Sequence, residues 1–252
     1  MTLRALIFDV DGTLAETEEA HRDAFNRAFA DLGLGWTWDK TLYRELLKIG
    51  GGRERVRAYA AEHAPDFLAR TDAEDAIAEI HERKTVHYGR WLAEGNVALR
   101  PGVERLIGEA QKNGVKVAIA TTSRDENVVG LLTRTLGPDG PKRFAVIAAA
   151  EAAQEKKPAP DVYLYALRAM GLNGTECLAI EDSPIGLAAA HAAGIPVLIT
   201  EYHYTAGADL AEALAIVSDL GEPGRPCRFV KGDAKGKTFV DLDLLRTWHA
   251  AA

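Results

Sequence analysis

The 252-residue sequence predicts an α/β fold, in which a parallel sheet carries a helical insertion after its first strand. From Pro101 onward, strand-like and helix-like segments alternate, a pattern typical of parallel strands joined by right-handed helical crossovers. Residues 18–91, by contrast, show helical periodicity alone. The length exceeds that of one average domain, so the chain accommodates a large core and a smaller insertion.

The first strand is the apolar run at residues 6–8, and the insertion follows it. Apolar residues at helical spacing from Ala24 to Leu32 predict its first helix, which Gly33 ends because glycine tolerates the left-handed conformation. Further helices are expected around residues 42–47, 56–59 and 77–84. We place the insertion at residues 16–94 and the sheet domain at residues 1–15 and 95–252.

The sheet domain repeats a strand followed by a helix. Ser183 and Pro184 are typical of an N-cap and a first helical position, and Gly194 closes the same helix. Helices are expected at residues 101–113, 125–136, 161–170 and 184–193, and strands at 115–120, 144–148, 177–180 and 195–199. A hairpin of residues 228–230 and 238–240 and a helix at 244–249 complete the expected fold.

Composition and charge narrow the function classes. A formal charge of -7 and a pI near 5.6 disfavour nucleic acids and anionic membranes as partners, because both repel an acidic surface. The spacing of Cys177 and Cys227 fits no metal or redox site, and we expect two small buried side chains in a reducing cytoplasm. There is neither a leader pattern nor an apolar run of about 18 residues, so we expect neither secretion nor membrane spanning. We further expect a monomer.

Polar residues follow several expected strands, at the edge where parallel sheets bind ligands. Asp9 and Asp11 follow the first strand, Thr121 and Ser123 follow the strand at 115–120, Lys157 follows the strand at 144–148, and Glu181 and Asp182 follow the strand at 177–180. Packed carboxylates repel one another unless a cation lies among them. Oxygen ligands without cysteine or histidine favour Mg²⁺.

The spacing of Asp9 and Asp11 suits phosphoryl transfer. Side chains alternate along an extended strand, so these two carboxyls point to one side and approach one reacting atom. One carboxylate can attack phosphorus while the other, protonated, donates to the departing oxygen. The residues therefore predict a reaction through an aspartyl phosphate, with the metal and Lys157 neutralising the phosphoryl oxygens.

Four ordered motifs resemble those of the haloacid dehalogenase superfamily: DVDGT at 9–13, Thr121, Lys157 with Pro158, and Glu181 with Asp182. The helical insertion is similar to the small cap of that superfamily, and the sheet to its Rossmann-like core. GGRER at 51–55, HERK at 81–84, KPAPDVY at 157–163 and EDSPIGLAAAHAAG at 181–194 further resemble the CbbY-type subgroup. The likeness covers nearly the whole chain. It implies a Mg²⁺-dependent phosphatase acting on a phosphorylated sugar, with conversion of xylulose 1,5-bisphosphate to xylulose 5-phosphate as the first candidate reaction.

The resemblance also implies roles for the motif residues. Asp9 would be the nucleophile and a metal ligand, and Asp11 the general acid that later activates water, with its carbonyl on the metal. Asp182 would complete the metal ligands. Glu181 would support the site either directly or through contacts with the residues that bind the metal. Thr121 and Lys157 would hold the phosphoryl oxygens. An acid at position 11 argues for phosphate rather than carbon–halogen chemistry.

The insertion offers a second phosphate receptor. Backbone N–H groups at an expected helix start, together with guanidinium groups, suit an anion, and the segment comprises Gly51, Gly52, Arg53, Glu54 and Arg55. Other candidate substrate contacts are Glu18, His21, Lys84, Ser123 and Arg124. Each of these side chains also has an ordinary structural interpretation as an exposed or packed residue. Trp36 and Trp38 are expected to anchor the core of the insertion, and residues 202–204 to pack a loop.

Two other functions compete with a phosphatase. A β-phosphoglucomutase-type phosphosugar mutase would use the same motifs and would return the phosphoryl group to another hydroxyl. A phosphoaspartate receiver module also uses aspartate, lysine and Mg²⁺. The receiver fits poorly, because such a module is shorter, has no helical insertion and carries its phosphorylated aspartate on a later strand.

Overall fold

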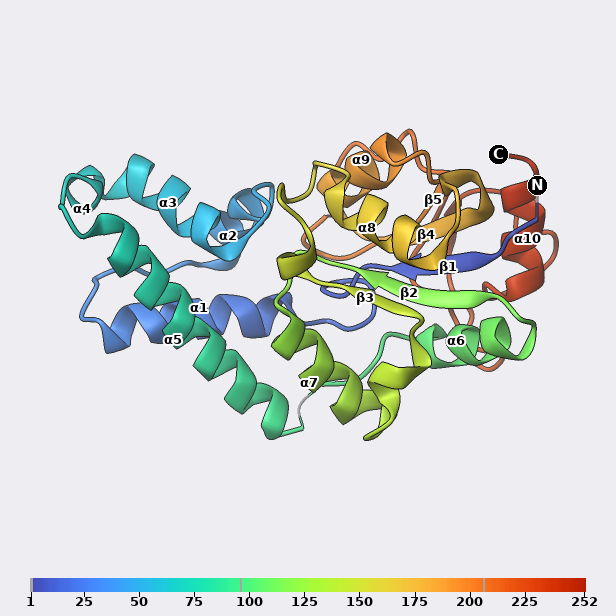
Figure 1. Ribbon diagram of the computed structural model, residues 1–252, viewed down its shortest axis with the longest axis horizontal. Coiled ribbons are helices and arrows are strands. Elements are labelled where there is room, and N and C mark those ends of the chain that lie inside the picture. Colours follow the sequence, from blue (N-terminus) through green and yellow to red (C-terminus); the bar gives the residue numbers. More distant parts are fainter. Residues whose placement is uncertain (1, 96, 206) are drawn as a thin grey trace. The chain divides into compact units, whose positions relative to one another are not determined.

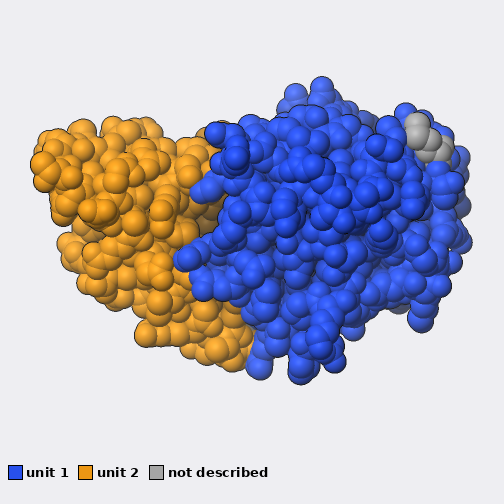
Figure 2. All heavy atoms as spheres, viewed as in Figure 1, with its two compact units in different colours: residues 1–16, 97–252 blue, residues 17–96 orange. Residues whose placement is uncertain are grey.

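A computed structural model describes residues 2–95, 97–205 and 207–252. The chain forms two compact units, one of residues 1–16 with 97–252 and one of residues 17–96 (Figure 2). These bounds lie within two residues of the predicted ones.

The larger unit is built on one sheet, as the alternating pattern predicts. Among the described residues it has seven strands in the order β3-β2-β1-β4-β5-β6-β7, all parallel except β7 (Figure 1). The strands are β1 Ala5–Phe8, β2 Lys116–Ala120, β3 Val146–Ala148, β4 Cys177–Glu181, β5 Val197–Thr200, β6 Ala215–Val217 and β7 Phe229–Lys231. The expected α/β class is confirmed.

Helices cover both faces of this sheet. The helices α8 and α9 pack on one face, over buried residues such as Ile7 and Ala179, and α6 and α7 lie on the other (Figure 1). The helices are α6 Val103–Lys112, α7 Asp125–Leu136, α8 Asp161–Met170, α9 Pro184–Ala192 and α10 Leu242–Ala250, with short 3-10 turns at Gly140–Arg143, Ala150–Ala152 and Gly174–Glu176. Ser183 caps α9 as expected, since its hydroxyl accepts a hydrogen bond from the Gly186 N–H at 3.1 Å.

The expected hairpin is wrong. Strand β7 pairs antiparallel with β6, a strand that was not predicted from the sequence, and residues 238–240 form no strand. The N–H of Cys227 does donate to the Thr238 carbonyl, but this single contact does not extend into a ladder. The Gly- and Lys-rich stretch between the two segments is therefore a loop that returns the chain to α10.

Among its described residues, the smaller unit has helices and no strands. It contains α1 Glu18–Asp31, α2 Lys40–Leu46, α3 Gly52–His63, α4 Pro65–Leu68 and α5 Ala73–Ala93. Trp38 is fully buried among the rings of Phe25, Phe29 and Tyr43, and Trp36 packs edge-on against Phe29. The expectation that the two tryptophans anchor this unit is confirmed. No helix among the described residues is long and apolar enough to cross a membrane.

The register of the larger unit positions the polar residues. Phe8 of β1 pairs with Ile119 of β2 on one side and with Ile180 of β4 on the other. The next residues along these three central strands therefore lie at the same level, at the carboxyl ends of the strands. They are Asp9, Ala120 and Glu181.

Candidate active site

A tight turn follows β1 and carries the two aspartates of the first motif. The Val10 carbonyl accepts hydrogen bonds from the N–H groups of Thr13, Leu14 and Ala15, at 3.2, 2.9 and 3.2 Å. Gly12 has a φ of +83°, and a Cβ there would lie 2.3 Å from Asp182 Oδ2. Only glycine therefore lets this turn approach the second carboxylate motif so closely.

Lys157 joins two of the motifs through its ammonium group. Its Nζ donates to Asp9 Oδ1 at 2.7 Å, to Glu181 Oε1 at 2.6 Å and to the Ala120 carbonyl at 2.9 Å. The whole residue is only 4% exposed. Burial alone would lower the pKa of Lys157, but the two carboxylates together raise it above its ordinary value, so the ammonium stays charged.

Three buried carboxylates converge at this point. Asp9, Glu181 and Asp182 each offer one oxygen, and these oxygens lie within 4.8 Å of one another. Burial, opposed by Lys157 but reinforced by Glu181 and Asp11, raises the pKa of Asp9 well above its usual value. One ammonium therefore does not balance the carboxylates. An all-oxygen donor set with excess negative charge suits a hard divalent cation such as Mg²⁺.

Glu181 is held by residues that the sequence reading did not identify. Tyr163 Oη donates to Glu181 Oε1 at 2.6 Å, and Oε2 accepts from the Asp182 N–H at 3.3 Å and from Ser183 Oγ at 3.5 Å. A Cβ at Gly186 would lie 2.0 Å from Glu181 Oε2, so this carboxylate packs directly on the backbone of α9. The motif KPAPDVY contained Tyr163, yet only the fold brings its hydroxyl to Glu181.

We expect Tyr163→Phe to lower the free energy of unfolding by about 1.5–3 kcal/mol, the usual contribution of a hydrogen bond to a charged group. Burial and the Glu181 carboxylate raise the pKa of Tyr163 well above its ordinary value, so its hydroxyl remains a donor. Urea unfolding checks this. Tyr165→Phe is the matched control, because Tyr165 lies on the same helix and is 40% exposed. Equal stability of the two variants would contradict the expected result.

The hydroxyl residues after β2 lie beside Asp11. Ser123 Oγ donates to Asp11 Oδ2, and the Ser123 N–H donates to Thr121 Oγ1 at 3.1 Å. Thr121 is buried. Arg124 is the N-cap residue of α7 and forms ion pairs with Glu126 at 3.2 Å and Glu151 at 3.8 Å. Its guanidinium is thus engaged on the surface of the larger unit.

In the smaller unit, aromatic rings bring together two candidate residues. The His21 ring stacks on Tyr88 with 4.0 Å between centroids. Lys84 Nζ lies 5.2 Å from the Tyr88 centroid and 5.4 Å from that of Phe25. Both His21 and Lys84 are buried. A basic group over aromatic rings can pack against the hydroxyl and carbon face of a sugar.

Glu18 and Arg55, two other candidate substrate contacts, both form hydrogen bonds with the hydroxyl of Tyr43. Its hydroxyl donates to Glu18 Oε2 at 2.9 Å and accepts from Arg55 Nη1 at 3.5 Å, while Arg55 Nε donates to the Ile49 carbonyl at 3.0 Å. Arg55 therefore braces the turn that precedes α3. Gly52 lies at the start of α3, where a Cβ would be 2.6 Å from His81.

The remaining candidates lie at the same helix start. Gly51, with a φ of +101°, is the N-cap residue of α3, and Glu54 lies in its first turn. Arg53 is exposed. The expected helix start, with backbone N–H groups and a guanidinium beside it, is therefore present.

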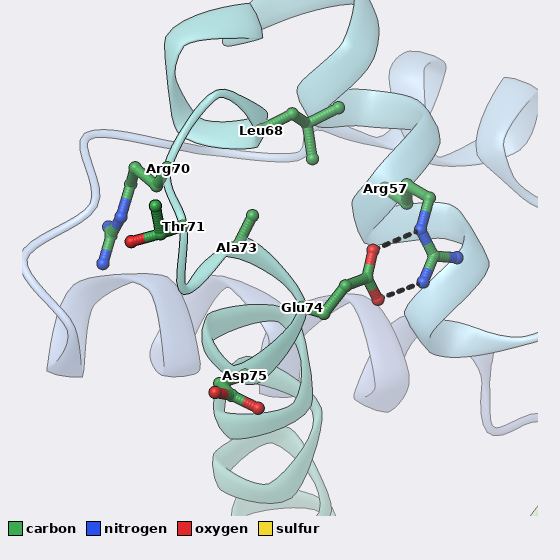
Figure 3. Close-up of a pocket in the computed structure, with 7 residues that line it drawn as sticks. All are labelled: Arg57, Leu68, Arg70, Thr71, Ala73, Glu74 and Asp75. Atoms are coloured by element: carbon green, nitrogen blue, oxygen red, sulfur yellow. Dashed lines mark hydrogen bonds and ion pairs between the residues drawn. The ribbon is translucent and has the colours of Figure 1, made fainter.

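A pocket of about 330 Å³ in the smaller unit contains none of the predicted site residues (Figure 3). Its two arginines are paired: Arg57 Nε with Glu74 Oε1 at 3.0 Å, and Arg70 Nε with Asp72 Oδ1 at 2.8 Å. Figure 3 shows the paired Arg57 and Glu74 on one side of it. It is lined by Arg57, Leu68, Arg70, Thr71, Ala73, Glu74 and Asp75. With these charges compensated, it does not compete with the carboxylate cluster as a catalytic site.

The fold and the four motifs define a class of enzyme. The family model of haloacid dehalogenase-like hydrolases matches residues 3–194, and the chain belongs to this family. It is 46% identical to the plasmid CbbY protein of Cupriavidus necator, over 98% of this chain and 97% of that protein. The crystal structure of CbbY from Rhodobacter sphaeroides in complex with phosphate matches with a TM-score of 0.81 and 41% identity, over 88% of this chain and 97% of that one. A mutant of the same CbbY in complex with xylulose-(1,5)bisphosphate matches with a TM-score of 0.80, the same identity and the same coverage.

Proposed function

We propose that the protein is a Mg²⁺-dependent sugar-phosphate phosphatase that converts xylulose 1,5-bisphosphate to xylulose 5-phosphate through an aspartyl phosphate. One observation carries the proposal: Lys157 contacts both Asp9 and Glu181 at the carboxyl ends of β1 and β4, with Asp182 beside them. The substrate rests on the likeness to CbbY, whose structure with this sugar bisphosphate is similar over 88% of the chain.

In the first step, an Asp9 carboxylate oxygen attacks phosphorus and the bond from phosphorus to the sugar oxygen breaks. Asp11 in its protonated form gives its proton to that departing oxygen, so the sugar leaves as an alcohol. Lys157 and Thr121 bind phosphoryl oxygens and orient the group for in-line attack. The hydrogen bond from Ser123 Oγ fixes the carboxyl of Asp11 for the proton transfer.

In the second step, a water molecule attacks phosphorus while the Asp11 carboxylate takes one of its protons. The bond from phosphorus to Asp9 breaks, which releases inorganic phosphate and restores both carboxyls. Asp9, Asp182 and the Asp11 carbonyl would hold the divalent ion. When bound, this ion would neutralise phosphoryl charge.

For Glu181 we favour a supporting role over direct metal ligation. Its Oε1 accepts from both Lys157 and Tyr163, and its Oε2 accepts from the Asp182 N–H and Ser183 Oγ. Both oxygens are thus already engaged by the protein. Glu181 would then keep the Lys157 ammonium charged and in position.

We assign the second phosphate of the substrate to the start of α3. Arg53 is exposed there, beside the N–H groups that begin the helix, and helix starts favour anions. His21, Lys84 and Glu18 would contact the sugar. Arg55, which holds the preceding turn, would act by shaping this receptor, and Arg124 would contact substrate from the larger unit.

We expect Arg53→Ala to raise the KM for xylulose 1,5-bisphosphate about 10- to 100-fold, because it removes one charged hydrogen-bonding group from the distal phosphate. Hydrolysis of p-nitrophenyl phosphate, which lacks that phosphate, should not change. Arg57→Ala is the control, since Arg57 lies on the same helix but pairs with Glu74. An equal loss on both substrates would refute the assignment of Arg53.

A panel of phosphorylated sugars with Mg²⁺, scored for free phosphate and for rearranged sugar, tests the function. Catalytic release of phosphate from xylulose 1,5-bisphosphate is expected. Stoichiometric isomer from β-glucose 1-phosphate without free phosphate would instead identify a mutase. A single stable phosphorylation without turnover would identify a receiver-like module.

We also propose a cytoplasmic monomer. Cys177 and Cys227 are both buried free thiols, and burial raises the pKa of Cys177 to about 12. Such thiols behave as small apolar side chains, as expected from the sequence. Sedimentation at assay concentration tests the oligomeric state.

A further inference from the structure

A buried guanidinium lies next to the catalytic turn in the larger unit. Arg100 is only 7% exposed, and its Nη1 donates to the Gly12 carbonyl and to Thr200 Oγ1, the latter at 3.0 Å. Its Nη2 donates to the Glu201 carbonyl at 2.6 Å and to the Ser218 carbonyl at 2.8 Å. A buried charge is costly unless such acceptors surround it. These four acceptors belong to the exits of three strands, β1, β5 and β6.

Arg100 is also tied to the turn through its backbone. Its N–H donates to the Leu14 carbonyl at 2.8 Å, and the preceding residue, Leu99, bridges to Ala15. Both the main chain and the side chain of Arg100 thus contact the turn from Asp9 to Ala15. The side chain of Arg100 reaches the carbonyl of Gly12, the residue directly after Asp11.

The neighbours of Gly12 leave the turn little freedom. A Cβ at Gly12 would lie 2.3 Å from Asp182 Oδ2 and 3.3 Å from the Tyr202 ring, over which the Arg100 guanidinium lies at 5.8 Å. Gly12 is therefore confined by Asp182 and Tyr202, and Arg100 hydrogen-bonds the peptide that joins Gly12 to Thr13. A shift of this turn would move the adjacent residue, Asp11, with both its carboxyl and its carbonyl.

We propose that Arg100 is a positioning residue, which fixes the turn at Gly12 and thereby orients Asp11 for proton transfer. This inference rests on the proposed function, because it acts through the role of Asp11 there. Lysine would not replace it, because only the planar fork of arginine donates to several carbonyls in fixed directions.

Arg105, in the first turn of α6, provides a matched control. Its Nε donates to Glu222 Oε2 at 2.9 Å, and its Nη2 to the carbonyls of Gly221 at 2.7 Å and Val240 at 3.0 Å. Arg105 therefore also holds several loops together through carbonyls. None of its partners belongs to the catalytic turn.

The test compares Arg100→Lys with Arg105→Lys, with p-nitrophenyl phosphate and xylulose 1,5-bisphosphate as substrates at a temperature below both melting transitions. For Arg100→Lys we expect kcat to fall about 100-fold on both substrates with KM within about threefold, because misplacement of a catalytic group costs rate rather than binding. Arg105→Lys should lower Tm about as much as Arg100→Lys does, and its kcat should stay within about twofold of the wild-type value.

Equal kcat values for the two variants would overturn the inference, as would a rise in KM at unchanged kcat. If Arg100→Lys is insoluble, Thr200→Val removes one hydroxyl acceptor and leaves the guanidinium in place. A severalfold lower kcat supports the proposal, and an unchanged kcat overturns it. Wild-type protein that released no phosphate from either substrate would refute the proposed function and, with it, this inference. An active wild-type protein with equally active variants would refute the inference alone.

Discussion

Asp9→Asn is expected to abolish turnover, with a loss in kcat of at least about 10⁴-fold, while the protein stays folded. The amide cannot attack phosphorus to form the aspartyl phosphate. The side chain is nevertheless nearly isosteric, and its carbonyl oxygen can still accept the Lys157 hydrogen bond that Asp9 Oδ1 accepts at 2.7 Å. Burial and the neighbouring carboxylates raise the pKa of Asp9, so removal of its charge relieves repulsion in the cluster.

Phosphate release and urea unfolding, measured on the same preparation, check both parts of this expectation. The free energy of unfolding without metal should equal or exceed that of the wild type. Asp75→Asn is the control, because Asp75 is an exposed aspartate of α5 in the smaller unit. Activity of Asp9→Asn within about tenfold of the wild type would contradict the role of Asp9 as nucleophile.

Lys157→Met has the second largest expected effect, and it acts on both rate and stability. The substitution leaves the buried carboxylates of Asp9 and Glu181 without their shared cation. Breaking a buried ion pair from one side typically costs about 3–5 kcal/mol. The substitution also removes a donor to the phosphoryl oxygens, which should lower kcat by a factor on the order of 10²–10³.

A double variant separates these two effects. Lys157→Met combined with Glu181→Gln removes the uncompensated charge together with the cation, so the free energy of unfolding should largely recover. Turnover should not recover, because the phosphoryl group still lacks its ammonium. A single variant with wild-type stability, or a double variant with restored turnover, would show that Lys157 does not act as described.

The central sheet could be predicted because its strands are short apolar runs between clear helix signals. The hairpin could not, because β6 has only three residues and its partner β7 is selected by position in the sheet rather than by a local turn. A Gly- and Lys-rich stretch looks like a turn in sequence whether or not the flanking segments pair. Tertiary pairing decides, and residues 238–240 have no strand partner.

The carboxylate cluster could be predicted for a different reason. Parallel strands in register bring the residues after their carboxyl ends together, so Asp9 and Glu181 had to be neighbours once β1 and β4 were adjacent. Arg100 and Tyr163 could not be found in this way. The partners of Arg100 are mostly backbone carbonyls of distant loops, which leave no trace in side-chain spacing. The contact between Tyr163 and Glu181 depends on how α8 packs on the sheet.

The most direct measurement is to locate a covalent phosphoryl group during turnover. Wild-type protein is mixed with isotopically labelled xylulose 1,5-bisphosphate and Mg²⁺ and quenched in acid within the first turnover. Label is expected in the peptide that contains Asp9, and none is expected when Asp9 is replaced by Asn. Turnover without any labelled protein, or label on a peptide that lacks Asp9, would contradict an aspartyl phosphate on Asp9.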